Sequence, residues 1–202
     1  NKELIGNLSN LVNRTLTFVK RFYDGNLGEG ALDEELKAQI IEKEKEITDS
    51  LERADERDAL RAIFALSDIG NKAFQASEPW KLRNEDPEKA KAILRTLVYL
   101  IRDLGVMVTP YMPSTGDKIL SFVSSPSAVW KDCGDFSGEI HIGEISLLFE
   151  KLEDKRVEEL RERYSGSQKD REEKKAEEPK KTEKKNKDEG KMDESKSLLE
   201  NW

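Results

Sequence analysis

The sequence predicts an all-α protein: a bundle of five or six helices, an irregular return segment, and a disordered charged tail. Two observations predict this class. Apolar residues recur at spacings of three and four in long runs, the pattern of helices that bury one face. The runs end at clusters of Gly, Pro, Ser and Asn, which are typical of turns. No alternation of strand and helix patterns, as in a parallel α/β fold, accompanies them.

The first helix is expected from about Leu4 to Phe22 and has two distinct faces. Its core-facing stripe consists of Leu4, Leu8, Leu11, Val12, Val19 and Phe22, with Thr15 among them. Its opposite, polar face consists of Asn10, Asn13, Arg14, Thr17 and Arg21. Asn10 and Arg14 lie one turn apart and point the same way. Periodicity alone favours a solvated face here, since most polar helix faces only contact water.

Two more helices should follow a turn over residues 24–30, where three glycines and Asn26 accept positive φ. The second helix begins near Leu32 or Asp33, whose acidic first turn suits the helix dipole. The third runs from about Ala54 to Gln75 and is ended by Ser77-Glu78-Pro79. Gly70 interrupts it, and a close packing contact would explain a glycine at that position.

The fourth helix is the central one, because its apolar stripe is the widest. It starts at Asp86-Pro87, an N-cap carboxylate followed by proline in the first turn, and runs to Val108. A fifth, short helix should start with Ser114 as its N-cap and end at Phe122. Residues 124–143 form a packed irregular segment with at most one short extended piece. A last helix spans about Glu153–Tyr164, with Gly166 as its stop.

Composition divides the chain into a bundle over residues 1–165 and a low-complexity tail or linker over residues 166–202. Apolar residues make up 36% and charged residues 38% of the chain, against roughly 45–50% and about 25% in typical domains. Between residues 167 and 196 the one apolar side chain larger than Ala is Met192, too little to offset the ordering entropy. Lysine pairs in the tail could touch phosphates, but neighbouring acids favour a soluble linker.

The sequence also argues against several classes of function. A net charge of −7 speaks against a protein that coats nucleic acid, although a small polar or basic site stays compatible. Cys133 is the one cysteine and His141 the one histidine, so we expect no disulfide within the chain, no metal site and no catalytic residues. No apolar run is long enough to span a membrane, and no signal peptide opens the chain.

Two fragments imitate the signatures of class I aminoacyl-tRNA synthetases. His141-Ile142-Gly143-Glu144 resembles HIGH, and residues 191–197 loosely resemble KMSKS. Both are rejected, because the first lacks its second histidine and a preceding strand, and the second lies in the charged tail.

Residues 1 to about 165 resemble the C-terminal anticodon-binding domain of methionyl-tRNA synthetase. Three correlated segments carry the match, and their order and spacing agree together. They are the run from Asn10 to Gly25, the run from Asn71 to Leu82, and the run from Leu100 to Pro113 with Ile142-Gly143-Glu144 and Leu148-Phe149 later.

The resemblance implies a binding site for the anticodon of a methionine tRNA. In that family an Asn and an Arg one turn apart contact the first anticodon base, a cytosine, and a Trp after a Pro stacks on it. The matching residues here are Asn10, Arg14 and Trp80. A core tryptophan is the alternative for Trp80, whereas Trp130 is interpreted as packing. Arg21, Lys20 and Lys81 are weaker candidates for contacts with the tRNA backbone.

The resemblance also implies partners that this chain does not contain. The parent enzyme is a cytoplasmic ligase of protein biosynthesis that uses ATP; its catalytic domain is absent here, and no cofactor is expected in this chain. The chain begins with Asn1 rather than Met, so we expect a fragment or a reduced protein. The alternative function is a non-catalytic helical adaptor of a synthetase assembly, which binds other synthetases or scaffold proteins. Asn10 and Arg14 far from Trp80 would favour that alternative.

Overall fold

The computed structural model describes residues 2–164, which divide into a unit ending at Lys151 and a C-terminal piece beginning at Leu152. In the described residues the regular structure is helical, which confirms the predicted class. The first unit contains η1 (Lys2–Ser9, a π-helix), α1 (Asn10–Tyr23), α2 (Glu34–Glu52), α3 (Glu56–Ser77), α4 (Pro79–Glu85), α5 (Pro87–Val108), α6 (Pro113–Phe122) and the 3₁₀ turn η2 (Trp130–Asp132). The second piece contains α7 (Asp154–Tyr164). The predicted stop at Gly166 and the predicted tail lie outside the described residues.

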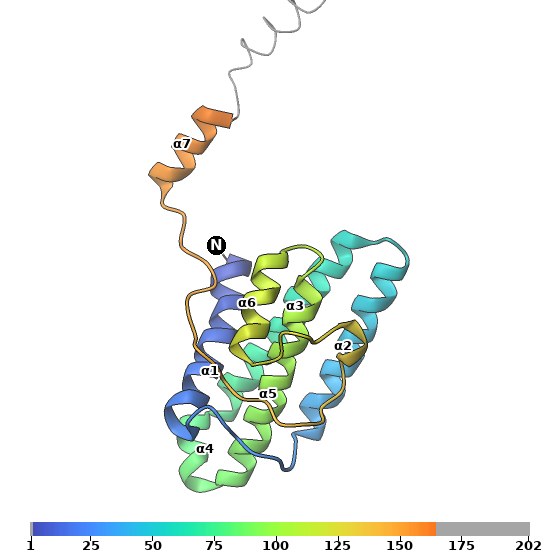
Figure 1. The fold of residues 1–202 in the computed structure, drawn as a ribbon, viewed down its shortest axis with the longest axis vertical. Coiled ribbons are helices and arrows are strands. Elements are labelled where there is room, and N and C mark those ends of the chain that lie inside the picture. Colours follow the sequence, from blue (N-terminus) through green and yellow to red (C-terminus); the bar gives the residue numbers. More distant parts are fainter. Residues whose placement is uncertain (1, 165–202) are drawn as a thin grey trace, which may run out of the picture. The chain divides into compact units, whose positions relative to one another are not determined.

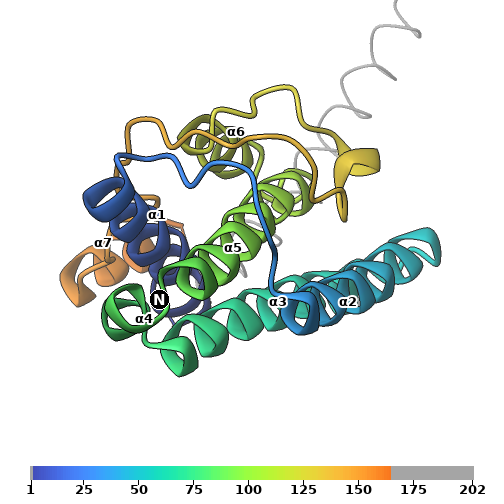
Figure 2. The same ribbon diagram turned by 90° about the horizontal axis from the view of Figure 1, so that it is seen from below.

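Helix α5 is the centre of the first unit, as its wide apolar stripe predicted. It packs against α1, α2, α3, α4 and α6, and Figure 2 shows it lying between α1 on one side and α3 on the other. Every residue from 92 to 108 is buried. Asp86 caps the helix by accepting a hydrogen bond from the Lys89 N–H at 3.1 Å, with Pro87 at the first helical position.

Polar side chains of α5 hold the two irregular segments in place. Arg95 donates to the carbonyls of Leu27 at 2.9 Å and Ala31 at 3.0 Å, in the loop before α2. Arg102 donates to the carbonyls of Asp132 at 2.8 Å and Asp135 at 2.7 Å, in the return segment. Buried backbone carbonyls need such partners. The return segment, which Figure 1 shows crossing the face of the unit, is therefore fixed by α5.

The structure differs from the sequence predictions at three places in the first unit. Pro79–Glu85 forms α4 rather than a loop, because Glu78 adopts a left-handed φ of 41° and Pro79 starts a new helix there. Helix α6 is preceded by Met112, so Ser114 lies inside the helix instead of capping it. Phe22 was assigned to the core stripe, but it is 36% exposed at the last turn of α1. The short extended piece is an isolated antiparallel bridge between Asn26 and His141.

Gly70 lies where α3 approaches α1 and α5 closely, as its place in the sequence predicted. A Cβ added there would lie 2.7 Å from Leu11 Cδ2 and 2.6 Å from Leu100 Cδ2. Real Cβ atoms essentially never approach a neighbour this closely. Any larger residue must therefore push α3 away from its two neighbours or displace both leucines.

We expect Gly70→Ala to destabilise the protein, although Ala is the better helix former by about 0.5–1 kcal/mol. Overpacking of a core costs roughly 1–3 kcal/mol, so the net loss should be about 1–2 kcal/mol. Urea unfolding monitored by circular dichroism measures this difference. An unchanged or increased free energy of unfolding would contradict the close contact.

A buried pair of carboxyl groups connects α2 to α5. Glu44 is 5% exposed and Asp103 is fully buried. Burial raises the pKa of Asp103, and the hydrogen bonds that Asp103 accepts from Arg102 Nε at 2.8 Å and from the Gly134 N–H at 3.1 Å oppose this by favouring its charged form. Burial, followed by the charge of Asp103, raises the pKa of Glu44 from 4.5 to about 9. If Glu44 is a carboxylate, its Oε1 is buried without a hydrogen-bond partner among the described residues. If Glu44 is protonated, its hydroxyl can donate a hydrogen bond to Asp103.

This pair makes stability depend on pH. Glu44 keeps its proton in the folded protein while the unfolded chain loses it above about 4.5, so stability falls as pH rises from there toward about 9. Glu44→Gln supplies a permanent N–H donor. It should therefore match wild type at pH 5 and exceed it at pH 8.5 by at least about 1 kcal/mol. Urea unfolding at both pH values checks this, with Glu42→Gln on the exposed face of α2 as control. An equal effect of Glu44→Gln at both pH values would contradict it.

Candidate functional site

The polar face of α1 lies at the surface of the first unit, beside α3. Asn10, Asn13, Thr17 and Arg21 are exposed, and Arg14 is half-buried. The opposite face of α1 is buried, including Thr15, as the helical projection predicted, with the exception of Phe22. Arg14 therefore differs from its neighbours on the polar face, because part of its guanidinium has left water and must be compensated within the protein.

Asn71 on α3 holds this face through both ends of its side chain. Its Oδ1 accepts a hydrogen bond from Asn10 Nδ2 at 3.1 Å. Its Nδ2 donates to Asn7 Oδ1 at 2.9 Å and to the Asn7 carbonyl at 3.0 Å. Its backbone carbonyl accepts from Arg14. Within the described part of the chain Asn10 Oδ1 receives no hydrogen bond, so it remains available as an acceptor.

Phe74, one turn after Asn71, brings Arg14 and Trp80 together. The Arg14 guanidinium carbon lies 4.4 Å from the centroid of the Phe74 ring. The Trp80 ring lies 6.3 Å from the same centroid, with the two planes tilted by 46°. Arg14 and Trp80 come from different helices, 66 positions apart in the sequence, and meet on one buried phenylalanine. Cation–π contacts of this kind contribute about 0.5–1 kcal/mol and orient the guanidinium.

The Arg14 guanidinium keeps unused hydrogen-bonding capacity. Its Nε is buried and has no partner among the described residues, and burial lowers the pKa of Arg14 from its usual value. An arginine stays protonated in proteins. Because Nε is buried, an acceptor from a ligand can reach only the terminal nitrogens of this guanidinium.

Trp80 owes its exposure to the break between α3 and α4. Glu78 in the left-handed region ends α3, and Pro79 is buried as the first residue of α4. Trp80 comes next and is 39% exposed, which agrees with the partly exposed ring expected from sequence. Trp130, interpreted as packing, instead donates through Nε1 to Thr48 Oγ1 at 3.1 Å and packs against the core.

A cleft of about 700 Å³ lies between η1 with the start of α1 and the middle of α3. Asn7, Asn10 and Arg14 line one wall, and Asn71 and Gln75 belong to the other. Trp80 is not among its lining residues. Its volume falls within the range of small-molecule sites, roughly 300–1,000 Å³. The amides and guanidinium of Asn10, Arg14 and Asn71 thus face space that a ligand of that size can enter.

The weaker candidates for backbone contacts already have partners inside the protein. Lys20 Nζ donates to the Gly143 carbonyl at 2.8 Å. Lys81 Nζ donates to both carboxylate oxygens of Glu78 at 2.9 Å. Arg21 lies over the Phe22 ring, with its guanidinium carbon 5.3 Å from the centroid. A phosphate at Lys20 or Lys81 would have to compete with these contacts.

The sequence predicted three residues for this candidate site, Asn10, Arg14 and Trp80, but not the residues that hold them in place. In the sequence, Asn71 stands out only as the start of a segment that resembles a known family, and no role at this site was predicted for Phe74. Asn7 could have been found, because it precedes Asn10 by three positions and shares its helix face. The role of Phe74 carries no local signal, since a core phenylalanine has the same sequence pattern whatever lies above it.

We expect Asn71→Ala to destabilise the protein by about 1–3 kcal/mol, because it leaves Asn7 and Asn10 with unpaired polar atoms. Asn13→Ala on the same polar face is the matched control, and an exposed substitution there should change stability by less than about 0.5 kcal/mol. Thermal and urea unfolding compare the two variants. Equal stability of both would show that the Asn71 hydrogen bonds do not hold α1 against α3.

Comparison with known families gives one match over most of the chain. A family model described as the anticodon-binding domain of methionyl-tRNA ligase matches residues 24–169. This range contains Asn71, Phe74 and Trp80 and begins after Asn10 and Arg14.

Similar proteins are methionine–tRNA ligases. The ligase of Treponema denticola is 38% identical over 202 aligned residues, which cover 85% of this chain and 26% of that protein. The ligase of Borrelia garinii subsp. bavariensis is 39% identical over 86% of this chain and 24% of its own length. The chain thus spans about a quarter of these relatives.

Among solved structures, the fold is similar to part of the Mycobacterium tuberculosis methionyl-tRNA synthetase. The complex of that enzyme with methionyl-adenylate aligns with a TM-score of 0.64 and 19% identity, over 75% of this chain and 32% of that one. A second structure, also bound by methionyl-adenylate, gives a TM-score of 0.62 and 20% identity, covering 74% and 32% of the two chains. At this identity the likeness is one of fold.

Proposed function

The chain belongs to the family of anticodon-binding domains of methionyl-tRNA ligase, and we propose that it binds the anticodon loop of methionine tRNAs and reads the first anticodon base. Asn10, Arg14 and Trp80 are the reading residues. The observation that carries this proposal is that Arg14 and Trp80 both contact Phe74. The Arg14 guanidinium carbon lies 4.4 Å, and the centroid of the Trp80 ring 6.3 Å, from the centroid of the Phe74 ring. That contact places a hydrogen-bonding group beside an aromatic surface, which is the combination that recognises an unstacked base.

Trp80 supplies the stacking surface. A ring that is 39% exposed and held against Phe74 can cover one face of a base that has left its own stack. Such stacking contributes about 1–3 kcal/mol per base and does not depend strongly on which base is present. Trp80 therefore accounts for affinity, and the choice of base has to come from polar groups beside it.

Asn10 and Arg14 supply the choice of base. Along one edge, cytosine offers an amino group as donor and two acceptors, a ring nitrogen and a carbonyl oxygen. The free Oδ1 of Asn10 suits the amino group, and the unused donors of Arg14 suit the acceptors. Uracil presents an acceptor where cytosine has the amino group and a ring N–H where cytosine has a ring acceptor, so both pairs become mismatched. A well-placed bidentate contact discriminates between bases by about 1–3 kcal/mol.

We assign the aminoacylation of tRNA to a partner domain. Since the chain covers about a quarter of its relatives, we place the activation of methionine with ATP, and its transfer to tRNA, in a catalytic domain that this domain serves. The proposed setting is cytoplasmic protein synthesis. None of the described helices is long and apolar enough to cross a membrane.

Binding of RNA hairpins that carry the anticodon stem and loop of a methionine tRNA tests the proposal. Four hairpins differing only at the first anticodon base are titrated by fluorescence anisotropy against the full 202-residue chain. Wild type should bind the cytosine hairpin about 5- to 100-fold more tightly than the others. Trp80→Ala should weaken binding of the cytosine hairpin by a similar factor and remove the preference, because the base is no longer held against Asn10 and Arg14.

Trp130→Phe is the matched control, because Trp130 is a tryptophan of the same unit that packs in the return segment. It should keep both affinity and preference. Arg14→Lys keeps the positive charge but loses the planar donors, so it should reduce the preference more than the affinity for RNA in general. If wild type and Trp80→Ala bind all four hairpins alike, the assignment is wrong.

A further inference from the structure

The last turn of α1 exposes an aromatic ring that the helical projection had assigned to the core. Phe22 is 36% exposed. It lies at the end of α1 and contacts α4, the helix that contains Trp80, through Arg83; Figure 1 shows α4 close to this end of α1. Exposed phenylalanines that pack only against a neighbouring core need no explanation. Phe22 differs because two charged groups lie over its ring, in addition to the Phe18 ring that packs against it.

Two arginines from different helices surround the Phe22 ring. The guanidinium carbon of Arg83, on α4, lies 4.1 Å from the ring centroid, and that of Arg21 lies 5.3 Å from it. Neither arginine forms an ion pair with an acidic side chain within residues 2–164. Arg83 Nε is also buried with no partner in that range. These cations are unneutralised on a protein whose net charge is −7.

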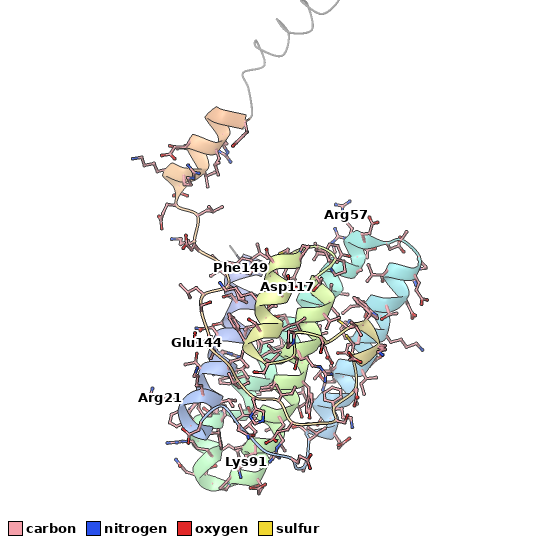
Figure 3. The ribbon with its side chains drawn as sticks, viewed as in Figure 1. Arg21, Arg57, Lys91, Asp117, Glu144 and Phe149 are labelled. Atoms are coloured by element: carbon pink, nitrogen blue, oxygen red, sulfur yellow. The ribbon has the colours of Figure 1, made fainter. Side chains whose placement is uncertain are left out.

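Two lysines near this cluster are paired with carboxylates. Lys91, which Figure 3 shows at the same end of the unit as Arg21, pairs with Glu88 at 2.9 Å. Lys81 pairs with Glu78 at 2.9 Å. Arg21 and Arg83 differ from these lysines because they carry positive charge without a carboxylate partner among the described residues. Both are planar groups that lie against a ring, which suits a nucleotide better than a simple anion.

The cluster is continuous with the Trp80 surface through packed rings. Trp80 lies 6.3 Å from Phe74, Phe74 lies 6.0 Å from Phe18, and Phe18 lies 4.6 Å from Phe22. The Arg14 guanidinium carbon lies 4.4 Å from the centroid of Phe74, the ring next to Trp80, and that of Arg83 lies 4.1 Å from the centroid of Phe22, the last ring of the row. The row therefore repeats the same arrangement twice, an aromatic ring with a guanidinium above it, on adjoining parts of one surface.

We propose that Phe22, Arg21 and Arg83 form a second nucleotide-binding subsite, which takes a base and a phosphate next to the nucleotide on Trp80. This inference rests on the proposed function. The Arg83 guanidinium, held by Phe22, stacks on the base, and Arg21 neutralises the phosphate. Stacking on the Arg83 guanidinium and pairing of Arg21 with a phosphate do not depend on which base is present. The subsite therefore adds affinity without adding preference for a particular base.

The same hairpin titrations, with the full chain, separate this subsite from the first. Arg83→Met keeps an apolar stem over Phe22 and removes the guanidinium. It should weaken binding of the cytosine hairpin by about 5- to 50-fold and leave the relative affinities of the four hairpins unchanged. Arg83→Lys keeps the charge without the plane, so it should lose nearly as much affinity. Arg21→Ala should lower the slope of log affinity against log salt by about 0.7.

Arg57→Ala is the matched control, because Arg57 is an exposed arginine at the opposite end of the unit from Arg21 in Figure 3. It should change neither affinity nor slope. Thermal unfolding of each variant excludes a loss of fold, and Phe22→Leu gives a second test that leaves both arginines in place and should also weaken binding.

Failure of this inference and failure of the proposed function give different results. If wild type prefers cytosine but the Arg83 and Phe22 variants bind like wild type, the second subsite is wrong and the first stands. If these variants lose the preference together with the affinity, the cluster only supports Trp80, and the inference is again overturned. If wild type has no preference, the proposed function fails. Weakened binding of an acidic peptide, with RNA binding unchanged, would assign the cluster to a protein partner and overturn the subsite.

Discussion

The burial of α5 on all sides is the constraint on which the rest of the structure depends. A helix surrounded by five others has no surface on which to leave polar groups in water, so each polar side chain it carries needs a partner inside the protein. Arg95 and Arg102, both 7% exposed, find these partners in the carbonyls of the loop before α2 and of the return segment. Segments without regular structure are thereby ordered by the helix they cover.

The same packing creates the candidate site. Because α5 fills the centre, α1 and α3 meet along its side, and Gly70 lets them approach until an added Cβ would lie 2.7 Å from Leu11. Asn71 is the next residue, so its side chain reaches across to Asn7 and Asn10. Phe74 follows one turn later and meets Arg14. The candidate site is thus a direct extension of a core contact.

Much of the fold was predictable because its signals are local. The proline and N-cap at Asp86-Pro87, the breaks near Gly25 and Pro110, and the wide stripe of α5 each follow from a few neighbouring residues. Helix α4 was missed because seven residues give too short a pattern to recognise. Phe22 was misplaced because a helical projection assigns a face but cannot show where the neighbouring helix ends.

The candidate site was predictable in its outer residues and not in its support. Asn10 and Arg14 stand out as a polar pair on one helix, and Trp80 through its position after a proline. Asn71 and Phe74 act through contacts across 57 to 64 positions of sequence, which no local pattern encodes. The same limit hid Arg83, whose contact with Phe22 depends on how α4 returns to α1.

The central claim is that the first anticodon base lies on Trp80. A methionine anticodon hairpin carrying 5-iodocytidine at that position can be bound to the full chain, irradiated, and its crosslink located by mass spectrometry. The predicted result is an adduct on Trp80 that unlabelled hairpin suppresses. An adduct on Trp130 or another distant aromatic residue, with Trp80 unmodified, would contradict the account.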